Sequence, residues 1–214
     1  RGCVMTKQDF QFFAKFAEKH NILPDLMAVE SWDLKTNEIK YVETAYVAKT
    51  GEWLREVEPP KQAKPSFQEA KRVFDSFITI EQNPDTGMVL LSFEHYSPHI
   101  AKLWLDWLIE DINSDMKTRD KQEAKRSINY LQSQIDETNI VEQKSLLYQL
   151  IEEQAKTLMF TEVREEYVFK TIDPALVPEV KFKPKRSFIV FIAILVGGLL
   201  SVLFVILKHF QSEK

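Results

Sequence analysis

The sequence predicts an α+β fold, in which a small mixed sheet carries a long protruding helical hairpin and a C-terminal transmembrane helix follows. Two β-prone runs, 78–82 and 88–94, flank a turn rich in Pro, Asp and Gly and predict a strand pair. Helical periodicity extends from 98 to about 137 and returns over 140–166, which predicts two long antiparallel helices. Residues 188–207 are apolar without a charge, which matches a bilayer core of roughly 30 Å.

These patterns divide the chain into four parts. We expect an α+β domain over 1–173, a proline-rich basic juxtamembrane segment over 174–187, the transmembrane helix over 188–207 and a short tail over 208–214. The chain has 214 residues, 44% of them hydrophobic, which is enough for one domain core beside the span. Because it begins with Arg1 and shows no leader or earlier span, we expect a fragment or processed form.

The first third of the chain predicts short elements. Phenylalanines at helical spacing indicate a helix over about 6–21, a short helical turn follows near 26–29, and an edge strand is expected over 38–42. The next stretch has little apolar content and is interpreted as a linker. Three prolines bracket it: Pro59, Pro60 and Pro65.

Two helix starts are marked by capping residues. Ser66 and Glu69 form an S-x-x-E capping box before a helix that reaches about Phe77. Ser97 supplies a capping hydroxyl before Pro98, which is tolerated at the first helical position because its missing N–H would be unpaired there. A long helix is therefore expected to begin at Pro98.

This long helix is predicted to project from the domain. From 98 to 137 it would be about 60 Å long. Nearly every residue over 117–127 is charged or polar, so its middle must protrude from the compact part or meet a neighbouring subunit. After the returning helix, 167–172 is a candidate strand that ends before Pro174.

The carboxy-terminal region combines prolines, basic residues and small residues. In the juxtamembrane segment, basic side chains would lie at the level of lipid phosphates, with simple anchoring favoured over recognition of a particular phosphate. This motif comprises Pro174, Pro178, Pro184, Lys185 and Arg186. Small residues line one face of the predicted span and would let another helix approach closely. They are Ala193, Gly197, Gly198 and Ser201.

Composition excludes several classes of function. The net charge is −4, which argues against a nucleic-acid partner. Cys3 is the only cysteine, so neither an internal disulfide nor a thiolate metal cluster is expected. The five glycines form no phosphate-binding loop, and we expect no cofactor.

Candidate chemistry is weak elsewhere. His95 and His99 straddle a helix start, so an exposed pair is favoured over a metal site. The adjacent glutamates at 152–153 and 165–166 point apart on a helix, which favours a solvated face over glycoside hydrolysis. Two tryptophans beside leucines are expected to be buried rather than to present rings to a sugar: Trp104 and Trp107. We therefore expect no catalytic residues.

The order of these features resembles the Wzz-type polysaccharide co-polymerases, the chain length determinant proteins of bacterial O-antigen lipopolysaccharide. The resemblance extends from about Ser66 to the end and is most specific where the proline-rich segment joins the second membrane helix. The segments that carry it are Ser97-Pro98, 150–154, 169–175, 177–179 and 183–186. There are two departures from the family pattern. In the proline segment the family usually has a further proline where Val180 and Lys181 stand and a serine where Lys183 stands, and in the span Ser201 replaces a second glycine.

The resemblance implies an inner-membrane protein with two spans, both ends in the cytoplasm and its main domain in the periplasm. It implies a ring of identical subunits that is not an enzyme and that sets the length of sugar chains made by a separate polymerase on lipid-linked repeats. This chain would then lack the first span. Charge alone would place the domain in the cytoplasm, but large domains translocate regardless of local charge. Relatives with a tyrosine kinase match poorly, because seven residues follow Leu207.

Three alternatives belong to other classes. A periplasmic adaptor of an export system also uses long helical hairpins and would have an outer partner at the hairpin tip. A sensor receptor is disfavoured because 208–214 leaves no room for a signalling domain. A carbohydrate-active enzyme would show turnover with a polymer substrate.

Overall fold

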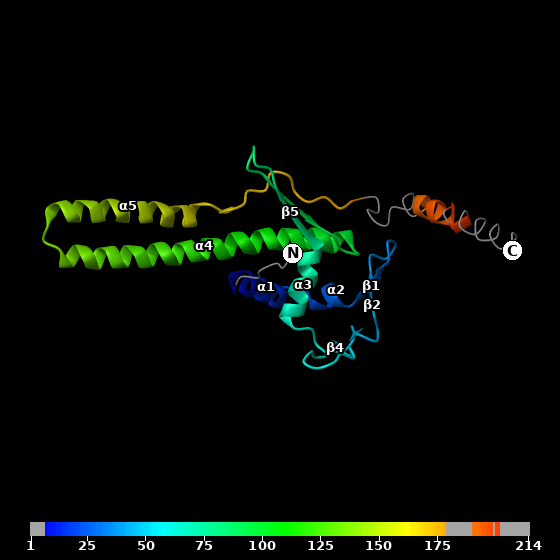
Figure 1. Cartoon of the computed structure of the whole chain (residues 1–214). Helices are drawn as coiled ribbons and strands as arrows, with labels where there is room; N and C mark the ends of the chain where they lie inside the picture. Colours follow the sequence, from blue (N-terminus) through cyan, green and yellow to red (C-terminus); the bar gives the residue numbers. More distant parts are fainter. Residues whose placement is uncertain (1–6, 179–189, 199, 202–214) are drawn as a thin grey trace, which may run out of the picture. The chain divides into compact units, whose positions relative to one another are not determined.

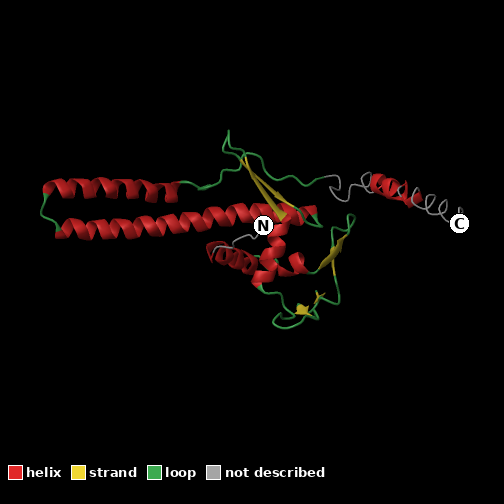
Figure 2. Cartoon of the chain, in the orientation of Figure 1, coloured by secondary structure: helices red, strands yellow, loops and turns green. Residues whose placement is uncertain are grey.

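The structure is a computed structural model that describes residues 7–178, 190–198 and 200–201. The chain divides into two compact units between Val177 and Pro178. In the first unit, helices alternate with short strand pairs (Figures 1 and 2). The helices are α1 (Lys7–Lys19), α2 (Leu23–Met27), α3 (Phe67–Phe77), α4 (Pro98–Glu137) and α5 (Val141–Val163). The strands are β1 (Val29–Trp32), β2 (Ile39–Tyr41), β3 (Tyr46–Val47), β4 (Glu52–Trp53), β5 (Ile78–Gln82) and β6 (Val89–Phe93).

The prediction of a single mixed sheet was wrong. Within the described residues, the strands form three separate two-stranded antiparallel pairs, β1–β2, β3–β4 and β5–β6. Each pair joins neighbours in sequence through a short turn, and no strand crosses to another pair. The β5–β6 hairpin has the predicted turn, in which Gly87 has a φ of 71° that suits glycine.

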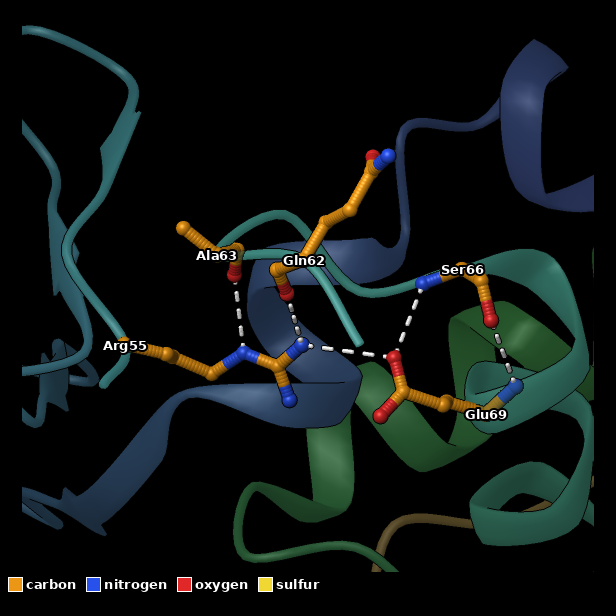
Figure 3. Close-up of polar contacts among 5 residues, drawn as sticks. All are labelled: Arg55, Gln62, Ala63, Ser66 and Glu69. Atoms are coloured by element: carbon orange, nitrogen blue, oxygen red, sulfur yellow. Dashed lines mark hydrogen bonds and ion pairs between the residues drawn. The ribbon is translucent and has the colours of Figure 1, made fainter. Parts of the chain in front are cut away.

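The helix starts were predicted correctly. At α3 the Ser66 hydroxyl accepts a bond from the Glu69 N–H, and the Glu69 carboxylate accepts one from the Ser66 N–H (Figure 3). The bond from the Ser66 N–H is the largest cause that lowers the pKa of Glu69. At α4 the Ser97 hydroxyl accepts from the Ile100 N–H, and Pro98 is the first helical residue.

The stretch interpreted as a linker is held in place by Arg55. Its guanidinium donates to the carbonyl oxygens of Ala63 and Gln62 at 2.9 and 3.1 Å and lies 3.4 Å from the Glu69 carboxylate (Figure 3). The same guanidinium lies over the Trp53 ring. Polar contacts from one side chain therefore hold the chain between β4 and α3, in which Pro65 is buried.

The core of the first unit lies where α1, α2, α3 and the start of α4 meet. Phe74 is at its centre, with ring contacts to Phe13, Phe16, Phe93 and Trp104 at centroid distances of 5.2–6.3 Å. The amphipathic patterns of α1 and α3 predicted Phe13, Phe16 and Phe74 as core residues. The buried cluster comprises Phe13, Phe16, Ala17, Ile22, Leu23, Leu26, Ala70, Phe74, Trp104 and Leu108.

Of the second unit, residues 190–198 and 200–201 are described, and they are helical. In this helix the Ser201 hydroxyl donates to the Gly198 carbonyl at 2.8 Å. Among the described residues, no helix combines the length and the apolar character needed to cross a membrane. The predicted span over 188–207 is only partly described, because 188–189, 199 and 202–207 lie outside the described residues.

Candidate functional site at the helical hairpin

The two longest helices form an antiparallel hairpin (Figure 1). Its helix–helix contact buries Ala124 and Ile135 of α4 and Thr161 of α5, whose hydroxyl donates to the Leu158 carbonyl at 2.6 Å. Lys121 and Glu162 form an ion pair of 2.5 Å. The predicted returning helix is confirmed, but it ends at Val163 rather than at 166 because Arg164 adopts an extended conformation.

One face of α5 carries apolar side chains that its partner helix does not cover. Val141, Tyr148 and Met159 are 74%, 55% and 50% exposed. Their separations of 7 and 11 residues place them on one side of an α-helix, away from the contact with α4. A shallow groove of about 520 Å³ opens along this face, between Val141 and Glu152. Exposed apolar side chains that share one face of a helix, here with polar residues such as Ser145 and Glu152 between them, are typical of an interaction surface.

A second set of exposed apolar residues lies on another side of α5. Its members are Leu146, Leu150 and Phe160. Together with the first stripe, they leave α5 apolar on more than the side that packs on α4. A helix that is apolar around most of its circumference is normally covered by several neighbours. The hairpin alone supplies one such neighbour.

At the base of the hairpin, Asp111 of α4 binds the end of α1. Its carboxylate oxygens accept bonds from Lys19 Nζ at 2.5 Å and from His20 Nε2 at 2.9 Å. Asp111 is 9% exposed, and the His20 ring stacks on Trp107 at a centroid distance of 4.2 Å. The hydrogen bond to Asp111 raises the pKa of Lys19. Both donors therefore compensate the burial of the Asp111 charge.

Asn113, two residues further along α4, binds the chain that follows α5. Its Oδ1 accepts from the N–H groups of Val168 and Phe169 at 2.8 and 2.9 Å, and its Nδ2 donates to the Phe169 carbonyl at 2.9 Å. The Asn113 residue is 7% exposed. We call these three bonds the Asn113 clamp, and residues 164–171 the return segment.

The candidate strand at 167–172 was wrong, since these described residues form no strand. The return segment lies along α4 and takes side-chain bonds in place of a ladder. Lys117 Nζ donates to the Arg164 carbonyl at 3.1 Å, and the Tyr167 hydroxyl donates to Asp120 at 2.7 Å. Burial and the bond to Asp120 raise the pKa of Tyr167.

His95 is not an exposed member of a histidine pair, which corrects that prediction. Its Nδ1 accepts from the Ser97 N–H at 3.1 Å, so the ring proton is on Nε2, which donates to the Asp25 carbonyl at 2.8 Å. His99 is exposed beside Trp32. No group of three or more potential metal ligands occurs among the described residues.

The other candidate residues have structural contacts. Trp104 is buried against Phe74 and Phe93, as predicted, whereas Trp107 is partly buried against His20. Glu152 pairs with Lys156 at 2.8 Å on the exposed side of α5. The side chain of Glu166 accepts from the Thr171 N–H at 3.1 Å.

The predicted juxtamembrane and packing residues are only partly described. Pro174 and Pro178 lie in irregular chain, whereas Pro184, Lys185 and Arg186 lie outside the described residues. Ala193, Gly197, Gly198 and Ser201 all lie in the helix of the second unit. At Gly197 and Gly198, nothing among the described residues lies within 4 Å of the position that a Cβ would occupy.

Sequence reasoning missed Asp111 and Asn113. Asp111 had a usable signal, because its spacing from Trp104 and Leu108 places it on the inner stripe of α4, where a carboxylate requires a partner. Asn113 had none, since its partners are backbone groups 55 and 56 residues away.

The end of α4, the uncovered face of α5 and the return segment lie in a stretch that a known family also contains. Residues 133–210 match the GNVR family, described as "G-rich domain on putative tyrosine kinase". The GNVR match includes the end of α4, all of α5 and the return segment. GNVR domains occur in polysaccharide co-polymerases, so the match supports that broad family. A comparison with curated proteins finds none that matches the chain.

Proposed function

We propose that this chain regulates the chain length of O-antigen lipopolysaccharide as an oligomeric inner-membrane scaffold for a separate polysaccharide polymerase. The GNVR match carries the proposal, because it covers α5, the helix with uncovered apolar faces. Copies of the chain would cover these faces by packing side by side into a ring. The proposal requires no catalytic residue, since the polymerase performs the chemistry.

In this proposal the apolar run 188–207 anchors the chain in the inner membrane and the first unit lies in the periplasm. The basic residues that precede the run contact lipid headgroups. Ala193, Gly197 and Ser201 recur every fourth residue and give another helix, of the ring or of the polymerase, a face for close approach. The growing lipid-linked glycan is then held beside a ring whose surface governs how long it stays engaged.

Deletion of the gene tests this function. Lipopolysaccharide from the deletion strain is separated on a gel beside that of the parent and of a strain complemented with the full-length gene. Loss of the modal band cluster, with its return on complementation, supports the proposal. An unchanged ladder in the deletion strain contradicts it.

A periplasmic adaptor of an export system is the second candidate. The exposed apolar residues Ile140 and Val141 at the turn of the hairpin favour it, because an adaptor binds an outer partner at its tip. If the chain is an adaptor, Ile140→Lys should abolish export and leave the polysaccharide length unchanged. If it is a length regulator, any effect of a substitution at the tip should be a change in polysaccharide length.

A further inference from the structure

In the Asn113 clamp, the side-chain amide of Asn113 binds the return segment as a peptide group of a neighbouring strand would. The amide pairs with both the N–H and the carbonyl of Phe169, and its oxygen takes a second bond from the Val168 N–H. Since backbone N–H groups only donate, the orientation of the amide is fixed by its partners. One buried side chain therefore satisfies three backbone groups of the return segment.

Apolar burial in the return segment comes from two partly buried aromatic side chains, Tyr167 and Phe169. Val168 is exposed, and so is Ile172, which follows the segment. A polar groove of about 430 Å³ lies between α4 and the return segment, with Asp106, Glu110 and Lys117 among its lining residues. The segment is also held to α4 by hydrogen bonds with the side chains of Asn113, Lys117 and Asp120. Segments held in this way open locally more easily than core elements.

The order of the chain gives the clamp a particular position. Residues 168–169 lie between the end of α5 at Val163 and the boundary of the first unit at Val177. Pro174, between the clamp and that boundary, has a restricted φ. The clamp is therefore a point at which the chain between α5 and the boundary is bound to α4.

We propose that Asn113 is a positioning residue that fixes the return segment to α4 and so keeps the last turn of α5 from opening. On the opposite face of α4, Asp111 holds α1, so the segment is fixed to the helix that also carries part of the core. The clamp does not depend on the proposed function of the chain.

Hydrogen exchange of the purified full-length chain tests the clamp. In Asn113→Ala, peptides over 164–171 should exchange about tenfold faster or more, because three bonds are lost. The last turn of α5, 158–163, should also exchange faster. Asn129→Ala is the matched control, since it makes the same change at an exposed site in the same helix, and it should exchange as the wild type does.

A graded series separates a specific clamp from general damage. Asn113→Asp keeps the acceptor but loses the donor to the Phe169 carbonyl, so its exchange should lie between those of the wild type and the alanine variant. Peptides over α3 report whether the core stays folded. If they exchange faster in the alanine variant, the exchange rates of the aspartate variant decide whether the clamp is present. An unchanged rate over 164–171 overturns the clamp, and an unchanged rate over 158–163 beside a faster 164–171 overturns the proposed protection of α5.

Chain length provides a separate readout. If deletion of the gene alters the modal length, Asn113→Ala should shift the length while cross-linking still detects the wild-type assembly. An unshifted length beside faster exchange overturns a role of the clamp in length control. If the deletion has no effect on length, the proposed function fails, and the exchange measurements still decide the clamp.

Discussion

Asp111 and Asn113 lie two residues apart on α4 and bind different parts of the chain on opposite faces. Two residues correspond to about 200° around an α-helix, so one side chain reaches α1 while the other reaches the return segment. Asp111 bonds to Lys19 and His20, and Asn113 bonds to Val168 and Phe169. This stretch of α4 therefore joins the amino-terminal helix to the chain that follows the hairpin.

Asp111→Ala should lower the free energy of unfolding by about 1–3 kcal/mol, because Lys19 and His20 lose a buried acceptor. Asp106→Ala is the control, since its ion pair with Lys102 is solvated, and it should cost less than about 0.5 kcal/mol. Urea unfolding followed by circular dichroism measures both. Equal losses in the two variants would show that the buried contacts add nothing.

Phe74→Ala should cost about 3–5 kcal/mol, because Phe74 fills the space between Phe13, Phe93 and Trp104 and its removal leaves a cavity. Thermal unfolding measures the loss. Tyr130→Ala, at an exposed position on α4, is the matched large-to-small control and should leave the melting temperature nearly unchanged. A small effect of Phe74→Ala would mean that the core closes around the gap.

Features set by local chemistry were predicted from the sequence. The capping box at Ser66 and Glu69 fixes the start of α3, and Ser97 with Pro98 fixes that of α4, because capping depends on residues within one turn. The turn between β5 and β6 is likewise local. The apolar spacing of α1 and α3 identified their buried faces, since helical periodicity determines which side chains share a side.

Features set by distant partners were not predicted. Residues 167–172 have the β-prone composition of a strand, but a strand requires a neighbouring edge, and here the bonds come from the side chain of Asn113. The pair β3–β4 is short and was missed because Tyr46 and Trp53 are stabilised by aromatic contact with each other rather than by a repeating pattern. His95 was expected to be exposed because its partner Asp25 is 70 residues away.

Glu69→Gln should change how stability depends on pH. The pKa of Glu69 is lowered in the folded chain by the Ser66 N–H and then by Arg55, from an ordinary value of 4.5. The ionised carboxylate therefore stabilises the fold above that ordinary value, and this contribution is lost as the pH falls through the lower folded value. Glutamine keeps a capping box but has no charge to titrate.

Unfolding of the wild type and of Glu69→Gln should accordingly be compared near pH 7 and near pH 3. The wild type should be the more stable protein near neutrality, and the difference should shrink in acid. Glu58→Gln, which changes an exposed glutamate in the same region, is the control for a general charge effect. A difference that grows in acid would contradict the assigned direction of the pKa shift.

Tyr148→Glu combined with Met159→Glu should weaken self-association without unfolding the chain. Both side chains are at least half exposed on one face of α5, so a charge costs little in the single chain but would be buried between copies. Gln122→Glu combined with Gln132→Glu, at two exposed polar positions on α4, is the control with the same added charge. Light scattering of the full-length chain gives the mass, and circular dichroism checks helicity. If the double variant retains the wild-type mass, the Val141–Tyr148–Met159 stripe is not where copies of the chain meet.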